Sequence, residues 1–196
     1  FMRMGNPTDE ASEAGFACGQ GCCSARDAED ARFVAGRLGI PFFALNFHDE
    51  FDRIVEYFVD EYTQGRTPNP CILCNEFLKF GRLLEYARAN GATAVATGHY
   101  ARIDRGANGV SLHRAVDPTK DQSYVLFRLG PDLLNQIRFP IGHMTKDEVR
   151  RRAEEIGLPV HDKPDSSDIC FVPDRDYSQL VRARRPDAFI PGEVVD

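Results

Sequence analysis

The chain has 196 residues and a mass of 22.0 kDa, with 42% hydrophobic and 28% charged residues, which suits one sizeable globular domain or one domain plus a fragment of the next. It contains no apolar run of about 18 residues and no signal-peptide core near its start, so we expect a cytoplasmic protein. The 24 basic and 30 acidic residues give a net charge of −6, which argues against nucleic-acid binding by bulk phosphate neutralisation.

Two local basic clusters still leave room for RNA recognition. One is Lys146 with residues 150–152, and the other is Arg182 with Arg184 and Arg185. Each cluster is equally typical of a solvated helix face.

The first elements follow from hydrophobic spacing. A stripe at helical period predicts a helix after the N-cap Ser24 that ends at Gly39, and residues 40–47 then predict a buried strand. A second helix is predicted from His48 to about residue 64. Its apolar face consists of Phe51, Ile54, Val55, Phe58, Val59 and Tyr62.

Residues 65–70, Gly-Arg-Thr-Pro-Asn-Pro, predict a rigid loop because two prolines remove amide donors. The loop leads Cys71 and Cys74 into a helix predicted over residues 75–90, and a helix N-terminus favours the thiolate form. The apolar face expected for this helix consists of Phe77, Phe80, Leu84 and Ala87. The two thiols alone leave three interpretations open: buried structural cysteines, a redox pair, or two ligands of a metal site.

The remaining ligands of such a metal site would come from other cysteines. Cys170 is the first candidate, and Cys18, Cys22 and Cys23 are the others. For these last three we favour a flexible loop near the active site over a second metal site.

Strands and helices alternate again in the second half of the chain. A short strand over residues 92–97 is predicted to end at Gly98-His99, and a hairpin over residues 100–115 follows. Residues 117–123 predict a polar loop. Thr145 with Glu148 predicts a capping box for a helix ending near residue 157, and residues 169–172 predict a short strand. Strands alternating with helices indicate a parallel sheet, whose ligands bind at the carboxyl ends of the strands.

Four of these segments together resemble one family, the tRNA-specific 2-thiouridylases of the PP-loop ATP pyrophosphatase superfamily. The segments are GRTPNPCILCN at residues 65–75, ATGHYA at 96–101, DPTKDQSY at 117–124 and DSSDICF at 165–171. The resemblance implies an ATP-dependent sulfurtransferase that thiolates the wobble uridine of tRNA at C2.

The resemblance also implies the fold and its division. We expect an α/β fold, a partial adenine-nucleotide alpha-hydrolase-like (Rossmann-like) parallel sheet with helices on both faces, followed by a helical tRNA-binding segment. Residues 1–116 would form a partial PP-loop core, 117–185 the tRNA-binding and catalytic-cysteine segment, and 186–196 a linker into a central domain. The family's SGGxDSS loop for ATP is not in this sequence, so we expect a fragment that binds ATP poorly and catalyses little by itself.

The resemblance assigns roles to particular positions. The thiol at Cys170 would carry a persulfide, and Cys74 would be its partner. Asn69, Pro70 and Cys71 would meet the target base; His99, Lys120, Asp121 and Gln122 would contact tRNA; Met2 and Gly98 would lie against ATP. The implied cofactors are ATP and Mg²⁺, and the implied partners are tRNA and a sulfur-donor protein, either a cysteine desulfurase or a sulfur relay.

Two residues depart from the family pattern, and the first of them opens an alternative. Cys71 stands where many members have aspartate, and Asp168 stands in place of the usual glycine near Cys170. Cys71, Cys74 and Cys170 would supply the three thiolates of a [4Fe–4S] cluster with one open iron, in which case Cys170 is a ligand and not a persulfide carrier. Outside the enzyme class, the alternative is a non-catalytic cysteine-metal module that binds RNA or a protein.

Overall fold

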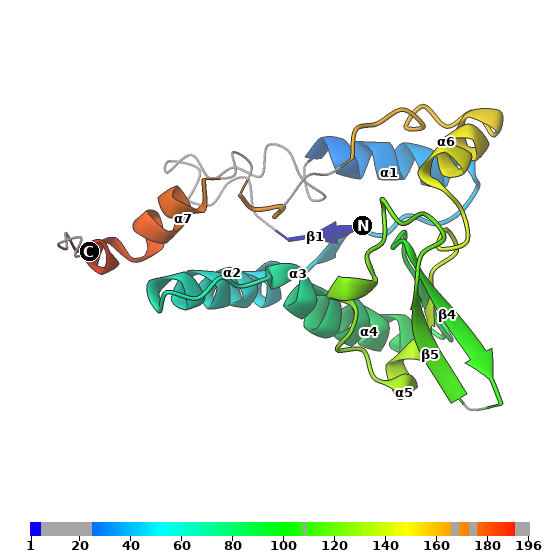
Figure 1. Cartoon of the computed structure of the whole chain (residues 1–196). Helices are drawn as coiled ribbons and strands as arrows, with labels where there is room; N and C mark the ends of the chain where they lie inside the picture. Colours follow the sequence, from blue (N-terminus) through cyan, green and yellow to red (C-terminus); the bar gives the residue numbers. More distant parts are fainter. Residues whose placement is uncertain (5–24, 108, 166–168, 173–175, 191–196) are drawn as a thin grey trace. The chain divides into compact units, whose positions relative to one another are not determined.

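A computed structural model describes residues 1–4, 25–107, 109–165, 169–172 and 176–190 of the chain (Figure 1). It divides into two compact units. The first unit comprises Phe1–Pro70 and Asp165–Asp196, and the second comprises Cys71–Pro164. Within the described ranges, no helix combines the length and the apolar character that a membrane span requires.

The first unit contains a short parallel strand pair. β1 (Met2–Arg3) pairs with β2 (Leu45–Asn46), with Met2 opposite Leu45, and α1 (Ala25–Arg37) lies between them in the sequence. The prediction of a buried strand over residues 40–47 is therefore wrong for most of its length. Pro41 has no amide to donate, and the side chains of Ile40 and Phe43 are 55% and 61% exposed. The N-cap predicted at Ser24 lies outside the described residues.

The core of the first unit is built on α2 (His48–Thr63), whose bounds confirm the predicted helix. The buried residues of α2 are Phe51, Ile54, Val55, Phe58 and Val59. Phe171 packs edge-on against Phe51 and Phe58, with ring centroids 5.6 and 5.1 Å apart. Residues 169–172 form a turn closed by the Val172 N–H donating to the Ile169 carbonyl, so the strand predicted there is wrong.

An acidic edge of α2 forms ion pairs with the end of α7 (Tyr177–Arg184) and with Arg185, and the short η4 (Pro186–Ala188) follows. Arg184 contacts Asp52 at 2.9 Å and also pairs with Glu56. Arg185 contacts Glu56 at 2.7 Å and Asp60 at 2.9 Å. Two members of the second basic cluster are therefore engaged inside the first unit, and neither is an open site for RNA phosphates.

One continuous helical run in three parts leads from Pro70, the last residue of this stretch of the first unit, into the second unit. The three parts are α3 (Pro70–Leu73), the π-helical η2 (Cys74–Arg82) and α4 (Leu83–Ala89). The run starts five residues before the predicted helix because Pro70 fits the first helical position, where no amide donor is needed. Phe80 and Leu84 are buried as predicted, but Phe77 is 56% exposed because the wider π-helical turn changes the spacing of the face.

The remaining strands of the second unit form two small ladders. β3 (Val95–Ala96) pairs in parallel with β6 (Ile137–Arg138), and β4 (Ala101–Gly106) forms the predicted antiparallel hairpin with β5 (Gly109–Arg114). The elements η3 (Ser123–Val125) and α5 (Pro131–Leu134) follow. The core of this unit includes the buried side chains of Phe80, Leu84, Leu126, Ile137 and Phe139.

The last helix of the second unit, α6 (Lys146–Glu155), confirms the predicted capping box. The Glu148 carboxylate accepts from the Thr145 N–H at 2.8 Å, and the Thr145 hydroxyl accepts from the Glu148 N–H. No residue of α6 is fully buried, and the helix mixes its basic residues with four carboxylates. Arg151 and Arg152 of the first basic cluster are therefore solvent-exposed, whereas Lys146 and Arg150 are half-buried.

Candidate functional site

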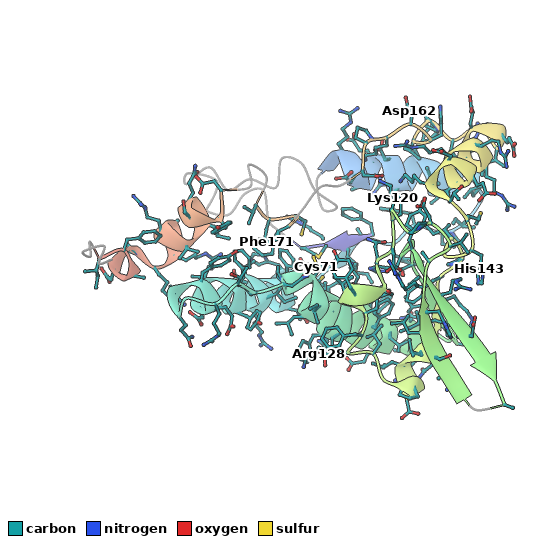
Figure 2. The ribbon with its side chains drawn as sticks, viewed as in Figure 1. Cys71, Lys120, Arg128, His143, Asp162 and Phe171 are labelled. Atoms are coloured by element: carbon teal, nitrogen blue, oxygen red, sulfur yellow. The ribbon has the colours of Figure 1, made fainter. Side chains whose placement is uncertain are left out.

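Cys71 and Cys74 lie at the start of the helical run. They are three residues apart, which places both side chains on the same side of the helix. Cys71 is half-buried, whereas Cys74 is 9% exposed. Figure 2 labels Cys71 at the beginning of this run.

Asn75, the residue after Cys74, fixes this turn to a distant loop. Its side chain is 1% exposed, and its Nδ2 donates to the Val125 carbonyl over 3.1 Å. The bond joins positions 50 residues apart. Sequence reasoning gave Asn75 no role, although an amide inside a helix, directly after a cysteine pair, was the available signal.

Gln122 connects the same loop to the segment after β3. Its side-chain Oε1 accepts from the Tyr100 N–H at 3.0 Å, and its own N–H donates to the Tyr100 carbonyl at 2.8 Å. The Val125 N–H in turn donates to the Gln122 carbonyl. Hydrogen bonds therefore join three motifs that are distant in the sequence: the cysteine pair, residues 117–124 and residues 96–101.

Asp121 points its carboxylate into the protein. The oxygens accept from the Ala115 N–H and from the Ser123 hydroxyl, both at 2.8 Å, and Arg114 lies 3.4 Å away. Burial raises the pKa of Asp121, but these hydrogen bonds together outweigh it and leave the pKa below its usual value. Asp121 and Gln122 thus hold the loop in shape, and half-buried Lys120 provides its positive charge (Figure 2).

His99 is buried among aromatic rings. It is 8% exposed, its ring centroid lies 6.0 Å from that of Phe80 and 5.7 Å from that of Phe139, and its Nδ1 is 2.8 Å from the Thr97 hydroxyl oxygen. Burial, assisted by the nearby charge of Lys79, lowers the pKa of His99 to about 3. His99 is therefore a neutral hydrogen-bonding group at physiological pH.

Gly98 lies just beyond the carboxyl end of β3 and is exposed. A Cβ atom placed on Gly98 would have one neighbour within 4 Å, the Ile141 Cδ1, at a van der Waals distance of 3.9 Å. The backbone at Gly98 is therefore open to close approach by a ligand.

The first unit contains the other predicted site residues. Met2 is half-buried in β1, and Asn69 is exposed between the buried Pro68 and Pro70. Cys170 is half-buried in the turn anchored by Phe171. Asp168 and the cysteines at positions 18, 22 and 23 lie outside the described residues.

The sequence leaves a redox pair and a metal site open as interpretations of the cysteines. Among the described residues, no three His, Cys, Asp or Glu side chains are grouped to hold a metal ion, and no disulfide bond is present. The predicted cluster ligands are divided between the units, with Cys170 in the first and Cys71 and Cys74 in the second.

Comparisons with known proteins identify the fold. Residues 1–174 match the family model described as the tRNA methyl transferase HUP domain. A HUP domain is a Rossmann-like α/β fold with a parallel sheet and helices on both faces, so the predicted fold class is confirmed.

Relatives come from several bacteria. The chain is 50% identical to a tRNA-specific 2-thiouridylase MnmA of Clostridium perfringens over 177 residues, which is 90% of this chain and 49% of the relative. It is 52% identical to that of Geobacter metallireducens (89% and 48%) and 50% identical to that of Rhodopirellula baltica (90% and 45%). The chain thus spans about half the length of the curated relatives it matches. On the family match and these identities, the chain belongs to the tRNA methyl transferase HUP-domain family, as a relative of the tRNA-specific 2-thiouridylases.

Proposed function

We propose that this chain forms part of an ATP-dependent tRNA-uridine 2-sulfurtransferase, which replaces the C2 oxygen of the wobble uridine with sulfur. The observation that carries the proposal is the identity of about half the residues, over nine-tenths of the chain, to proteins named tRNA-specific 2-thiouridylase. The hydrogen-bonded junction of three motifs in the second unit supports it, because distant motifs converge there on one region.

The first chemical problem is the leaving group, because a carbonyl oxygen does not leave readily. ATP would supply an AMP group to the uridine O2, with release of pyrophosphate. Met2 and Gly98 are the residues we assign to the nucleotide, and the open backbone at Gly98 fits such an approach. Mg²⁺ would accompany ATP, and no step is assigned to it here.

Sulfur transfer would then use two thiols. The terminal sulfur of a Cys170 persulfide attacks C2, forming a carbon–sulfur bond, and AMP leaves with the former O2. The Cys74 thiolate next attacks the Cys170 sulfur, which breaks the sulfur–sulfur bond and leaves one sulfur on the base. The two cysteines end as a disulfide, so an external thiol must reduce them and a sulfur-donor protein must restore the persulfide. This chemistry requires the sulfur atoms of Cys74 and Cys170 to meet.

The base itself would meet Asn69, Pro70 and Cys71. Asn69 projects from a segment held by two buried prolines, and its amide can both donate to and accept from a uracil edge. Lys120, Asp121, Gln122 and His99 would form the remaining tRNA contact, with Lys120 facing phosphate and neutral His99 acting as a hydrogen-bonding group. In functional terms, residues 1–116 would be the catalytic core, 117–185 the tRNA and cysteine segment, and 186–196 a linker.

A [4Fe–4S] cluster on Cys71, Cys74 and Cys170 is the alternative way to hold the sulfur. In that arrangement the three thiolates would hold the cluster and leave one iron open for sulfide, and we assign no step to it. Anaerobic purification with iron and sulfide analysis separates the two routes. An iron-free protein that thiolates tRNA excludes the cluster, and a metal-loaded protein that never thiolates tRNA supports the non-catalytic module.

Thiolation of tRNA by the complete protein tests the proposed function. Wild type should form 2-thiouridine with ATP, whereas Cys74→Ser and Cys170→Ser should form none. Cys71→Asp, which restores the residue common in the family, is the matched control and should keep its activity on the persulfide route. Activity retained in either serine variant would remove that thiol from the mechanism.

A further inference from the structure

Two aromatic side chains project from the turn that follows Lys120–Gln122. Tyr124 is 63% exposed and Phe127 is 66% exposed, whereas Val125 and Leu126 between them are buried at 6% and 0%. Exposing two large rings forgoes much favourable burial, because aromatic side chains contribute more apolar area than most others. The pattern therefore marks Tyr124 and Phe127 as a candidate contact surface.

The turn that carries the rings is held firmly within the second unit. Tyr124 lies in η3, where the Leu126 N–H donates to the Ser123 carbonyl, and the Leu129 N–H donates to the Leu126 carbonyl in the turn that follows. Tyr124 and Phe127 are three positions apart and exposed, whereas the two residues between them are buried, so both rings lie on the solvent side of this segment.

Two further contacts anchor the turn to the helical run. Asn75 donates to the Val125 carbonyl, and the Arg128 Nε lies 3.0 Å from the Glu76 carboxylate. The rings are therefore presented by a fixed backbone, so binding would require little ordering of the turn itself.

Charge indicates the kind of partner. The second unit has 14 Lys and Arg against 11 Asp and Glu, whereas the first has 10 against 19. Net charges of +3 and −9 follow, so the overall acidity of the chain resides in the first unit and a polyanion is attracted to the second.

Unpaired RNA has both properties that a ligand of exposed aromatic rings on a basic unit needs. It has anionic phosphates and flat bases that stack on aromatic side chains once they are splayed out of a helix. Lys120, four residues before Tyr124, would be placed for the phosphate of the same strand. A double-stranded stem, with its bases already stacked on one another, would gain nothing from the rings.

We propose that Tyr124 and Phe127 form a stacking surface for unpaired nucleotides of the RNA substrate. This inference rests on the proposed function, since it assumes that the substrate is tRNA, and it adds two recognition residues and the single-stranded part of the RNA as their target.

The test is fluorescence anisotropy of the full chain with a fluorescein-labelled RNA hairpin that has an unpaired loop, compared with the same stem as a blunt duplex. Tyr124→Ala and Phe127→Ala should each weaken hairpin binding about fivefold or more and leave duplex binding unchanged. Tyr124→Phe should bind like wild type because it keeps the ring. Phe127→Leu should lose as much as Phe127→Ala, because it keeps apolar area but has no aromatic face.

Two control variants separate stacking from charge and from general damage. Lys120→Ala should lower the slope of log Kd against log salt by about one, whereas the aromatic variants should leave this slope unchanged. Tyr86→Ala, at a 39% exposed ring on α4, should change nothing. Circular dichroism melting of each variant checks the fold.

Three results would overturn the inference. The first is an unchanged hairpin affinity in both alanine variants, and the second is the absence of hairpin binding by the wild-type chain. The third is a wild-type hairpin affinity in Phe127→Leu, which would indicate an apolar surface for a protein partner. The thiolation assay on the complete protein judges the proposed function separately, so each can fail without the other.

Discussion

At His99, burial between Phe80 and Phe139 keeps the imidazole neutral and makes stability sensitive to acid. The pKa is about 3 in the folded chain and about 6.5 when unfolded, so between these values the unfolded state binds a proton that the folded state does not. The contribution of His99 to the unfolding free energy is therefore fully present above pH 6.5. It decreases as the pH drops, by up to about 1.4 kcal/mol per pH unit.

Urea unfolding between about pH 7.5 and 5 checks this dependence, since carboxyl groups with lowered pKa values contribute only at more acidic pH. A His99→Gln variant, which cannot take up the proton, should show a flatter profile over this range. Parallel profiles for wild type and variant would show that His99 is not the group responsible.

Also at the residue scale, Asn75 should matter for stability more than an exposed asparagine does. Asn75→Ala leaves the buried Val125 carbonyl without its donor, which should cost about 1–3 kcal/mol of unfolding free energy. Asn90 donates to the Tyr86 carbonyl at 2.8 Å at the exposed end of the same helical run. Asn90→Ala is thus the matched control and should cost clearly less; equal losses in chemical denaturation would contradict the anchoring role.

At the scale of elements, the ion pairs between α2 and α7 make the docking of α7 sensitive to salt. The four contacts are partly exposed, so their combined contribution to stability is modest. The double variant Arg184→Gln/Arg185→Gln should increase proteolytic cleavage within α7 at low salt and match wild type at about 1 M salt, where charges are screened. Arg151→Gln on α6 is the control, and a salt-independent difference would point to lost packing instead.

Elements with their own local signal were predictable from the sequence, and those that depend on a distant partner were not. The α2 helix and the capping box of α6 follow from periodicity and from Thr145 with Glu148. The strands predicted over residues 40–47 and 169–172 failed because an apolar run becomes a strand only where a partner strand is available. The π-helical turn after Cys74 and the bond from Asn75 to Val125 depend on packing, which no local pattern reveals.

At the scale of the whole molecule, charge and chemistry are divided between two units. The second unit joins the cysteine pair, the Lys120 loop and Gly98-His99 through hydrogen bonds, and it is the more basic of the two. The first unit contains Cys170, Met2 and Asn69. Hydrogen bonds therefore bring three of the sequence motifs together in the second unit. The proposed sulfur transfer adds the requirement that Cys170 of the first unit reach Cys74.

Peptide mass spectrometry under non-reducing conditions, after a single turnover of the complete protein loaded with persulfide, tests this requirement directly. The proposed mechanism predicts a Cys74–Cys170 disulfide that accumulates in proportion to 2-thiouridine, in wild type and in Cys71→Asp alike. Thiolated tRNA formed while Cys74 and Cys170 both remain thiols would contradict it.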